Sequence, residues 1–315
     1  MLLNHITWNL DPVLFSIGNI HVRWYGLMWA LGFLLGYFVM RKIYRREKMS
    51  DESLDKLLVF MLLFTVVGAR LGHCLFYEPK EYLSHPLSIL KVWEGGLASH
   101  GGAIGILLGL WLYVRSYNKS TKKTKDNPQR INYIWILDRI VVPVCLVGAL
   151  IRFGNVTNHE IYGTPTSMPW GFVFMQGDKQ FAGTFDNPIP FDYCYSCDMN
   201  PNSSYEPQYP QSEWLPCHPT GIYEALFCFL AMGILLWMYY KRDLGHKQPG
   251  LMFGTFLVII FGSRIGIEFL KNVQVDFERN MLFDMGQWLS VPFVLIGIGM
   301  IVWSFIHRRK VESQA

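Results

Sequence analysis

Long apolar stretches recur along this chain and alternate with short polar segments. Each is about 20 residues long, which at about 1.5 Å per residue suffices to cross about 30 Å of hydrocarbon. The pattern therefore predicts an all-α integral membrane protein with seven transmembrane helices, near residues 24–40, 57–77, 97–117, 131–153, 219–240, 251–270 and 283–306. Residues 1–20 mix aromatic and polar side chains without a long apolar run, which is typical of a short segment on the membrane surface.

The loops between these stretches are alternately rich and poor in Lys and Arg. The basic loops follow the first, third, fifth and seventh apolar stretches and hold eighteen of the 28 basic residues. Because basic loops are retained on the cytoplasmic side of a membrane, we expect the N-terminus outside and the C-terminus inside. The composition agrees with this class: 51% of residues are hydrophobic and 17% are charged, which excludes a soluble fold and a disordered chain. No pattern of basic and aromatic residues indicates a nucleic-acid partner.

Five arginines lie within or at the ends of the apolar stretches, where a guanidinium costs about 2.5 kcal/mol or more. Arg23 can extend to the interface, and Arg139 follows an aspartate near the inner end of its stretch, so both have local explanations. Arg70, Arg152 and Arg264 are expected at one depth on three helices, in the outer half of the membrane.

A bound anion is the simplest joint explanation of these three arginines. Arg264 has Glu268 at the i+4 spacing of a local ion pair, so a purely structural pairing explains Arg264 alone equally well. Arg70 and Arg152 have no acidic residue three or four positions away. An anionic ligand would therefore account for all three.

Small and polar residues surround these arginines. Glycines at four-residue spacing predict faces of close helix packing: 101, 105 and 109, the pair 68 and 72, the pair 32 and 36, and the pair 262 and 266. After Arg152 we expect Gly154 to end the helix, so that Asn155, Asn158 and Glu160 fall in an irregular stretch. Irregular backbone at membrane depth is tolerated only where it lines an enclosed polar cavity.

Several motifs together resemble one family. They are Y-G-L-M at 25–28, G-A-R-L-G at 68–72, E-G-G-L-A-S-H-G-G at 94–102, R-F-G-N-V-T-N-H-E-I-Y-G at 152–163, H-P-T-G-I-Y-E at 218–224 and R-I-G-I-E-F at 264–269. In this order the motifs are similar to those of the bacterial prolipoprotein diacylglyceryl transferases, over about residues 20–305. The chain departs from the family at Thr164, where a second arginine is usual, and at Gly221, where glutamine is frequent.

The resemblance implies an enzyme that moves the diacylglyceryl group of phosphatidylglycerol to the lipobox cysteine of a preprolipoprotein. A thioether forms and glycerol 1-phosphate leaves, in the outer leaflet of the bacterial inner membrane. It also implies one transmembrane catalytic domain over 1–315, with the interfacial segment 1–20 and a periplasmic loop or cap at 164–217. Matching positions carry the family's functional residues onto Tyr25, His100, Arg152, Asn155, Asn158, Glu160, Gly163, Arg264 and Glu268.

The implied reaction explains why these residue types are expected at the site. Negative charge accumulates on the leaving phosphate, which arginine binds through two parallel N–H groups. Arg152 and Arg264 are therefore expected on the phosphate, and Arg70 is either a third contact or a structural support. His100 is either a base for the acceptor thiol or a neutral positioning group. Displacement by a thiolate needs no metal and no cofactor, so none is expected.

Two features keep alternatives open. Cys194, Cys197 and Cys217 lie in the long outer loop, where a disulfide is expected but its pairing is undetermined, and a zinc site with His218 is a weaker alternative. An organic-anion transporter or a non-catalytic lipid-binding membrane subunit would also gather arginines. Transporter sites lie near the midplane, however, and the chain shows no convincing internal repeat.

Overall fold

The computed structural model describes residues 5–18, 20–91, 96, 98–120, 130–199, 205–272 and 284–312. Part of the basic segment after the third apolar stretch (121–129) and part of the motif before His100 (92–95 and 97) lie outside these residues. The long helices of the described chain are α1 (Trp24–Arg46), α2 (Asp51–Phe76), α4 (Ser99–Ser120), α5 (Tyr133–Thr157), α7 (Thr220–Tyr240), α9 (Leu251–Glu268) and α10 (Met285–Glu312).

Short elements connect these helices. The helical turns are α3 (Pro79–Ser84), η1 (Pro86–Leu90), α6 (Tyr195–Asp198), η3 (Gln211–Glu213) and α8 (Leu244–Lys247). The strands are β1 (Ile6–Trp8), β2 (Val13–Ile17), β3 (Ile20–Arg23), β4 (Phe172–Phe174), β5 (Lys179–Gly183) and β6 (Pro188–Asp192). They form three two-stranded sheets, of which β1–β4 is parallel and β2–β3 and β5–β6 are antiparallel.

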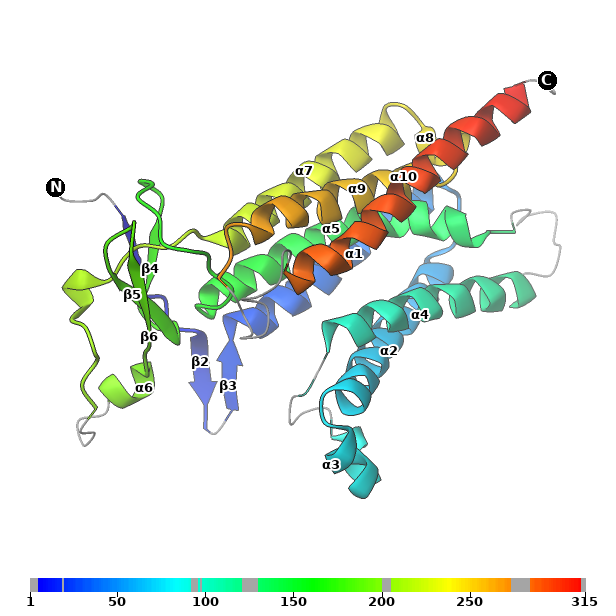
Figure 1. Cartoon of the computed structure of the whole chain (residues 1–315). Helices are drawn as coiled ribbons and strands as arrows, with labels where there is room; N and C mark the ends of the chain where they lie inside the picture. Colours follow the sequence, from blue (N-terminus) through cyan, green and yellow to red (C-terminus); the bar gives the residue numbers. More distant parts are fainter. Residues whose placement is uncertain are drawn as a thin grey trace.

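The strands gather at one end of the helix bundle, on the side of the N-terminus, and the C-terminus lies at the opposite end (Figure 1). Within the described residues, six long helices are apolar and long enough to cross a membrane; α4 is not among these six. The membrane part of the protein is therefore all-helical. The strands belong to the segments before α1 and between α5 and α7, so part of the expected surface segment and of the expected cap is β-structure.

The helices pack in two groups. Helix α2 packs along α4, while α1, α5, α7, α9 and α10 form the rest of the bundle (Figure 1). The predicted glycine face of α4 is confirmed, because a Cβ added at Gly101 or Gly105 would collide with the backbone of α2. The prediction was wrong for Gly262 and Gly266, since a Cβ added at either glycine would meet no atom within 4 Å.

The end of the bundle opposite the strands holds a buried ion pair. The guanidinium of Arg139 is fully buried and donates to Oε1 of Glu47 from Nε at 3.0 Å, with Nη2 at 2.9 Å. The hydroxyl of Tyr239 donates to the same oxygen at 2.7 Å, and the ring of His246 contacts the other carboxylate oxygen at 2.7 Å. These contacts join α1, α5, α7 and α8.

The neighbouring Asp138 fixes the start of α9. Its carboxylate is fully buried and accepts backbone hydrogen bonds from Gly250 at 2.6 Å and Phe253 at 2.8 Å. These amides belong to the first turn of α9, where backbone N–H groups have no partner within the helix. The carboxylate of one helix thus caps the next.

Candidate active site

Helix α5 continues past the position where it was expected to end. Gly154 is helical, and the helix runs on to Thr157. The glycine allows close packing instead, because a Cβ at this position would lie 2.8 Å from Cδ2 of Tyr25 on α1. The last two turns of α5 therefore carry Arg152 and Asn155, and Gly154 between them packs against Tyr25.

Arg152 is anchored by groups on two helices. Its Nε lies 2.6 Å from Oε2 of Glu224 on α7, and its Nη1 donates to Oδ1 of Asn155 at 3.3 Å. The Glu224 side chain is 8% exposed, whereas that of Arg152 is 25% exposed. A buried carboxylate thus fixes one edge of a guanidinium that remains partly accessible.

The network continues to α9 through Lys271. The ammonium of this buried lysine lies 2.8 Å from Oε1 of Glu224 and 3.2 Å from Oε2 of Glu268. Nε of Arg264, one turn earlier on α9, lies 4.0 Å from the same oxygen of Glu268. The chain of alternating charges therefore joins the two arginines that the sequence analysis expected in one site. We call this group the outer charge cluster; it consists of Arg152, Glu224, Lys271, Glu268 and Arg264.

An irregular turn follows α5, as expected. Nδ2 of Asn155 donates to one oxygen of Glu160 at 3.3 Å, and Nδ2 of Asn158 donates to the other at 3.2 Å. His159 and Ile161 flank Glu160 and both have a φ of 55°, an unusual conformation for residues with a Cβ and a costly one for a β-branched residue. The strained turn holds the two amides and the carboxylate together.

Gly163 fixes the position of this turn against α9 and α7. Its N–H donates to the carbonyl of His218 at 2.8 Å, and its own carbonyl accepts from Nδ2 of Asn272 at 2.6 Å. A Cβ here would collide with the carbonyl of Leu270. Glycine is therefore required at this close approach of three segments.

Among the described residues, the buried side-chain atoms of this region without a hydrogen-bond partner are Oδ1 of Asn158, Nε of Arg264 and the two carboxylate oxygens of Glu224, of which the Glu224 oxygens take part in ion pairs. The side chain of Arg264 is 38% exposed, while Glu268 is 9% exposed. Because buried polar atoms are normally satisfied, a donor such as Nε of Arg264 favours an anionic partner, and an acceptor such as Oδ1 of Asn158 favours a hydroxyl group. With its carboxylates buried and both guanidinium groups partly accessible, the outer charge cluster can accept an anion.

His100 and Arg70 lie on the α2–α4 pair, and no described contact joins them to the outer charge cluster. His100 begins α4 with an exposed side chain. Arg70 is 3% exposed and donates to the carbonyls of Ser88 at 2.6 Å, Ile89 at 2.9 Å and Gly96 at 3.3 Å. Its guanidinium also lies 4.9 Å from the ring centre of Tyr82, so Arg70 holds the α3–η1 connection against α2.

The outer cysteines form one disulfide, between Cys194 and Cys197. Cys217 is free and buried, and burial raises the pKa of its thiol to about 12. Because two of the four suggested ligands are joined to each other, the alternative zinc site is not formed. Burial also lowers the pKa of His218, which contacts the hydroxyl of Tyr223 at 3.1 Å.

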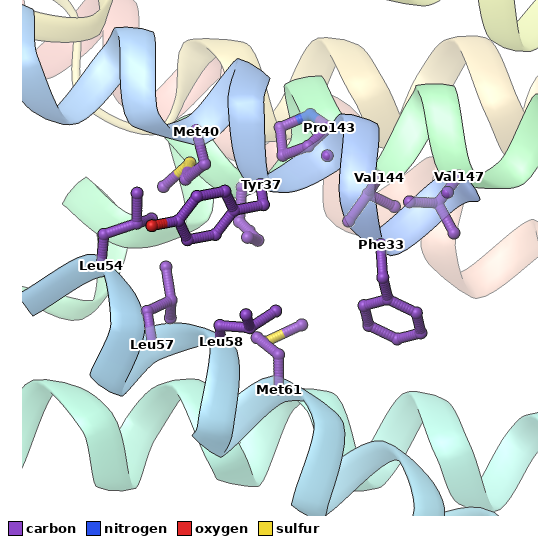
Figure 2. Close-up of a pocket in the computed structure, with 13 residues that line it drawn as sticks. Phe33, Tyr37, Met40, Leu54, Leu57, Leu58, Met61, Pro143, Val144 and Val147 are labelled. Carbon is purple, nitrogen blue, oxygen red and sulfur yellow. The ribbon is translucent and has the colours of Figure 1, made fainter. Parts of the chain in front are cut away.

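An apolar cleft lies between the α1–α5 seam and the first half of α2. Its volume is about 70 Å³, and the labelled side chains of the three helices surround the opening (Figure 2). The hydroxyl of Tyr37 is the polar group nearest to it and donates to Asp55 at 2.7 Å. The cleft is therefore suited to hydrocarbon.

Sequence reasoning missed Lys271 as a site residue, and it included Glu224 only as the last residue of the 218–224 motif. Lys271 stands three residues after Glu268, the spacing of a pair on one helix face, which is the signal that could have found it. No comparable signal links Glu224 to Arg152, because their contact is made between two helices.

Helices apolar enough to cross a membrane define a multi-pass membrane protein, and two partly accessible guanidinium groups in a frame of buried carboxylates form an arrangement suited to an anionic group. The family model of the prolipoprotein diacylglyceryl transferases matches residues 12–303. The chain belongs to this family.

Relatives named phosphatidylglycerol–prolipoprotein diacylglyceryl transferase match nearly the whole chain. The protein of Tolumonas auensis is 42% identical over 303 residues, which cover 96% of this chain and 99% of the relative. That of Porphyromonas gingivalis is 42% identical over 303 residues and 94% of each chain. That of Chloroherpeton thalassium is 40% identical over 310 residues and 98% of each chain.

Proposed function

We propose that this protein transfers the diacylglyceryl group of phosphatidylglycerol to the lipobox cysteine of a preprolipoprotein. The observation that supports this most is the outer charge cluster, in which Arg152 and Arg264 remain partly accessible above buried carboxylates. It lies among helices apolar enough to span a membrane, where an anionic lipid would supply the phosphate. The names of the relatives point to the same two substrates.

In this proposal the lipid phosphate binds between Arg152 and Arg264. The acceptor thiolate attacks the glycerol carbon, a C–S bond forms, the C–O bond to phosphate breaks, and glycerol 1-phosphate leaves with the electron pair. Arginines that are already oriented stabilise the charge developing on phosphate without reorganisation. Glu224 and Glu268 act by holding the guanidinium groups. Asn155 and Asn158 bind phosphate oxygens or the headgroup hydroxyls, and Glu160 orients these two amides and accepts a headgroup hydroxyl.

The remaining residues receive supporting parts. Tyr25 lies against Gly154 and would orient the headgroup or a guanidinium, and Gly163 fixes the turn. An acceptor thiol with a pKa near 8.5 is only slightly ionised at neutral pH, so His100 serves either as its base or as a positioning group. We assign Arg70 to structural support, since three carbonyls already engage its guanidinium.

The topology belongs to the same proposal. We place α4 in the membrane as a seventh span, because its glycine face packs along α2 for most of its length. The distribution of basic residues puts the N-terminus outside, the C-terminus inside and the charge cluster toward the outer leaflet of the bacterial inner membrane.

The decisive experiment incubates the purified protein with phosphatidylglycerol and a lipobox peptide and measures the peptide mass. A diacylglyceryl adduct on the cysteine supports the proposal, and a matched peptide with serine at that position should remain unmodified. Lipid binding without an adduct would indicate a non-catalytic lipid-binding subunit. Uptake of an organic anion into vesicles without an adduct would indicate a transporter.

A further inference from the structure

The apolar cleft lies on the same α1–α5 seam as the contact between Tyr25 and Gly154 in the candidate active site. Tyr25 contacts Gly154 at the top of this seam, Gly32 faces Val147 below it, and Gly36 faces Pro143 and Val147 below that. On α1 the steps from residue 25 to 32 and 36 keep one helix face, and on α5 the steps from 154 to 147 and 143 do the same. The lower two layers line the cleft.

The depth of the cleft matches the lower part of a lipid tail. Gly32 lies seven residues below Tyr25, or about 10 Å along the helix, and Met40 lies fifteen residues below, or about 22 Å. The tails of an outer-leaflet lipid reach the midplane about 15 Å below the interface. A tail whose headgroup lies beside Tyr25 would therefore end inside the cleft.

The size of the cleft selects between its possible occupants. A volume of about 70 Å³ accommodates a few water molecules or a short run of methylenes. An α-helix of about 10 Å diameter, such as a signal peptide would form, does not fit. The closed end is formed by Met40, Leu54 and Leu57, each 2% exposed, so a longer tail would meet a wall of packed side chains.

We propose that this cleft holds the end of one acyl chain of the lipid donor and sets the preferred chain length. The proposal rests on the proposed function, because it requires a lipid bound at the outer charge cluster. Side chains from α2 project into the opening opposite α1 and α5, and Leu58 is among them (Figure 2). Its side chain is partly buried, so a larger residue there would fill the cleft.

The test compares donors that differ only in acyl length. Leu58→Trp should lower kcat/KM for long-chain phosphatidylglycerol relative to short-chain phosphatidylglycerol at least fivefold, the lower range of the cost of forcing extra methylenes into a packed site. Met40→Ala, which deepens the closed end, should shift the preference toward longer chains. Leu63→Trp is the matched control, because Leu63 lies on the same helix, is 54% exposed and does not line the cleft.

Retained turnover with short-chain donors shows that the variants are folded. A Leu58→Trp protein that loses activity equally for all chain lengths, or one in which only the KM for the acceptor peptide rises, would overturn the proposal. Failure of the wild-type protein to lipidate the peptide with any donor would contradict the proposed function instead. That result differs from a change in how the activity of the variants depends on acyl-chain length.

Discussion

The two ends of the helix bundle each contain a buried arginine–glutamate contact, but they differ in what remains accessible. At the end opposite the strands the side chains of Arg139 and Glu47, here called the inner pair, are 0% and 1% exposed, and Tyr239 and His246 complete the carboxylate's contacts. In the outer charge cluster the carboxylates are similarly buried, yet Arg152 and Arg264 are 25% and 38% exposed. The inner pair therefore holds helices together, whereas the outer pairs leave two guanidinium groups partly accessible, as the proposed phosphate site requires.

Breaking the inner pair should produce the largest change in stability. Arg139→Gln leaves the buried Glu47 without its main counter-charge, and we expect a loss of about 3–5 kcal/mol in the free energy of unfolding. Thermal unfolding in detergent measures it. Arg115→Gln is the control, because Arg115 is exposed and contacts the ring of Trp111. Equal stability of the two variants would contradict a structural role for the inner pair.

Changing the outer arginines should affect activity more than folding. Arg152→Gln and Arg264→Gln should each lower kcat/KM about 100-fold or more, as removal of a donor to transition-state charge does. Lys271 still pairs with Glu224 in the first variant, which limits the loss of stability. Arg264→Lys should also be poor, since an ammonium cannot bind phosphate through two parallel N–H groups.

Arg23→Gln provides the control for these variants, because it removes one positive charge from the exposed start of α1, outside the cluster. Its turnover should stay close to that of the wild type. Turnover near the wild-type level in a folded Arg152→Gln or Arg264→Gln protein would contradict the assignment of that arginine to the lipid phosphate.

The outer disulfide should contribute stability but not chemistry. Substituting Cys194 and Cys197 together with serine should cost about 2 kcal/mol at most, since the closed loop is short, and turnover of the folded protein should persist. Adding Cys217→Ser should likewise spare turnover. Ser196→Ala, a change in the same segment, serves as control. A diacylglyceryl adduct on any of these cysteines after incubation with phosphatidylglycerol alone would instead indicate a covalent enzyme intermediate.

The smallest expected effect is a pH dependence of stability, caused by histidines in the segments that flank the helices. Burial lowers the pKa of His159 below its usual 6.5, and its neutral ring contacts the carbonyl of Leu10 at 2.9 Å while Nδ1 accepts from the N–H of Gln176 at 3.3 Å. The unfolded chain binds a proton more readily, so stability should fall as the pH drops below about 6.5. The melting temperature should change less between pH 7 and pH 5 in His159→Gln than in the wild type, and the remaining pH dependence should come from His218. An unchanged pH dependence of the melting temperature would contradict this role of His159.

The apolar pattern located the seven long helices of the described residues but not their ends. The predicted stretch at 24–40 continues as helix to Arg46, and the one at 57–77 begins at Asp51, where Ser50 caps the helix. Apolarity marks the part of a helix that lies in hydrocarbon, whereas polar turns extend the helix into water. Gly154 was assigned a helix-breaking role because glycine is a poor helix former, yet here tertiary packing against Tyr25 determines its conformation.

Only those features of the candidate site that follow from the membrane depth of a residue and from sequence spacing were predictable. The expectation that Arg152 and Arg264 share a site agrees with the cluster that joins them. The depth argument also included Arg70, which packs on a different helix pair. The contacts of Glu224 with Arg152 and Lys271 depend on how α5, α7 and α9 pack, and no local pattern encodes this arrangement.

The most direct measurement uses phosphatidylglycerol that carries a photoreactive group on its headgroup glycerol. After illumination of the protein in membranes, peptide mapping should find label near the outer charge cluster, on the segments around Arg152, Asn158 and Arg264. Excess unlabelled phosphatidylglycerol should compete for this labelling, and Arg152→Gln should reduce it. Label concentrated around Arg139 and His246, or spread evenly over the lipid-facing helices, would contradict the assignment of the outer cluster as the phosphate site.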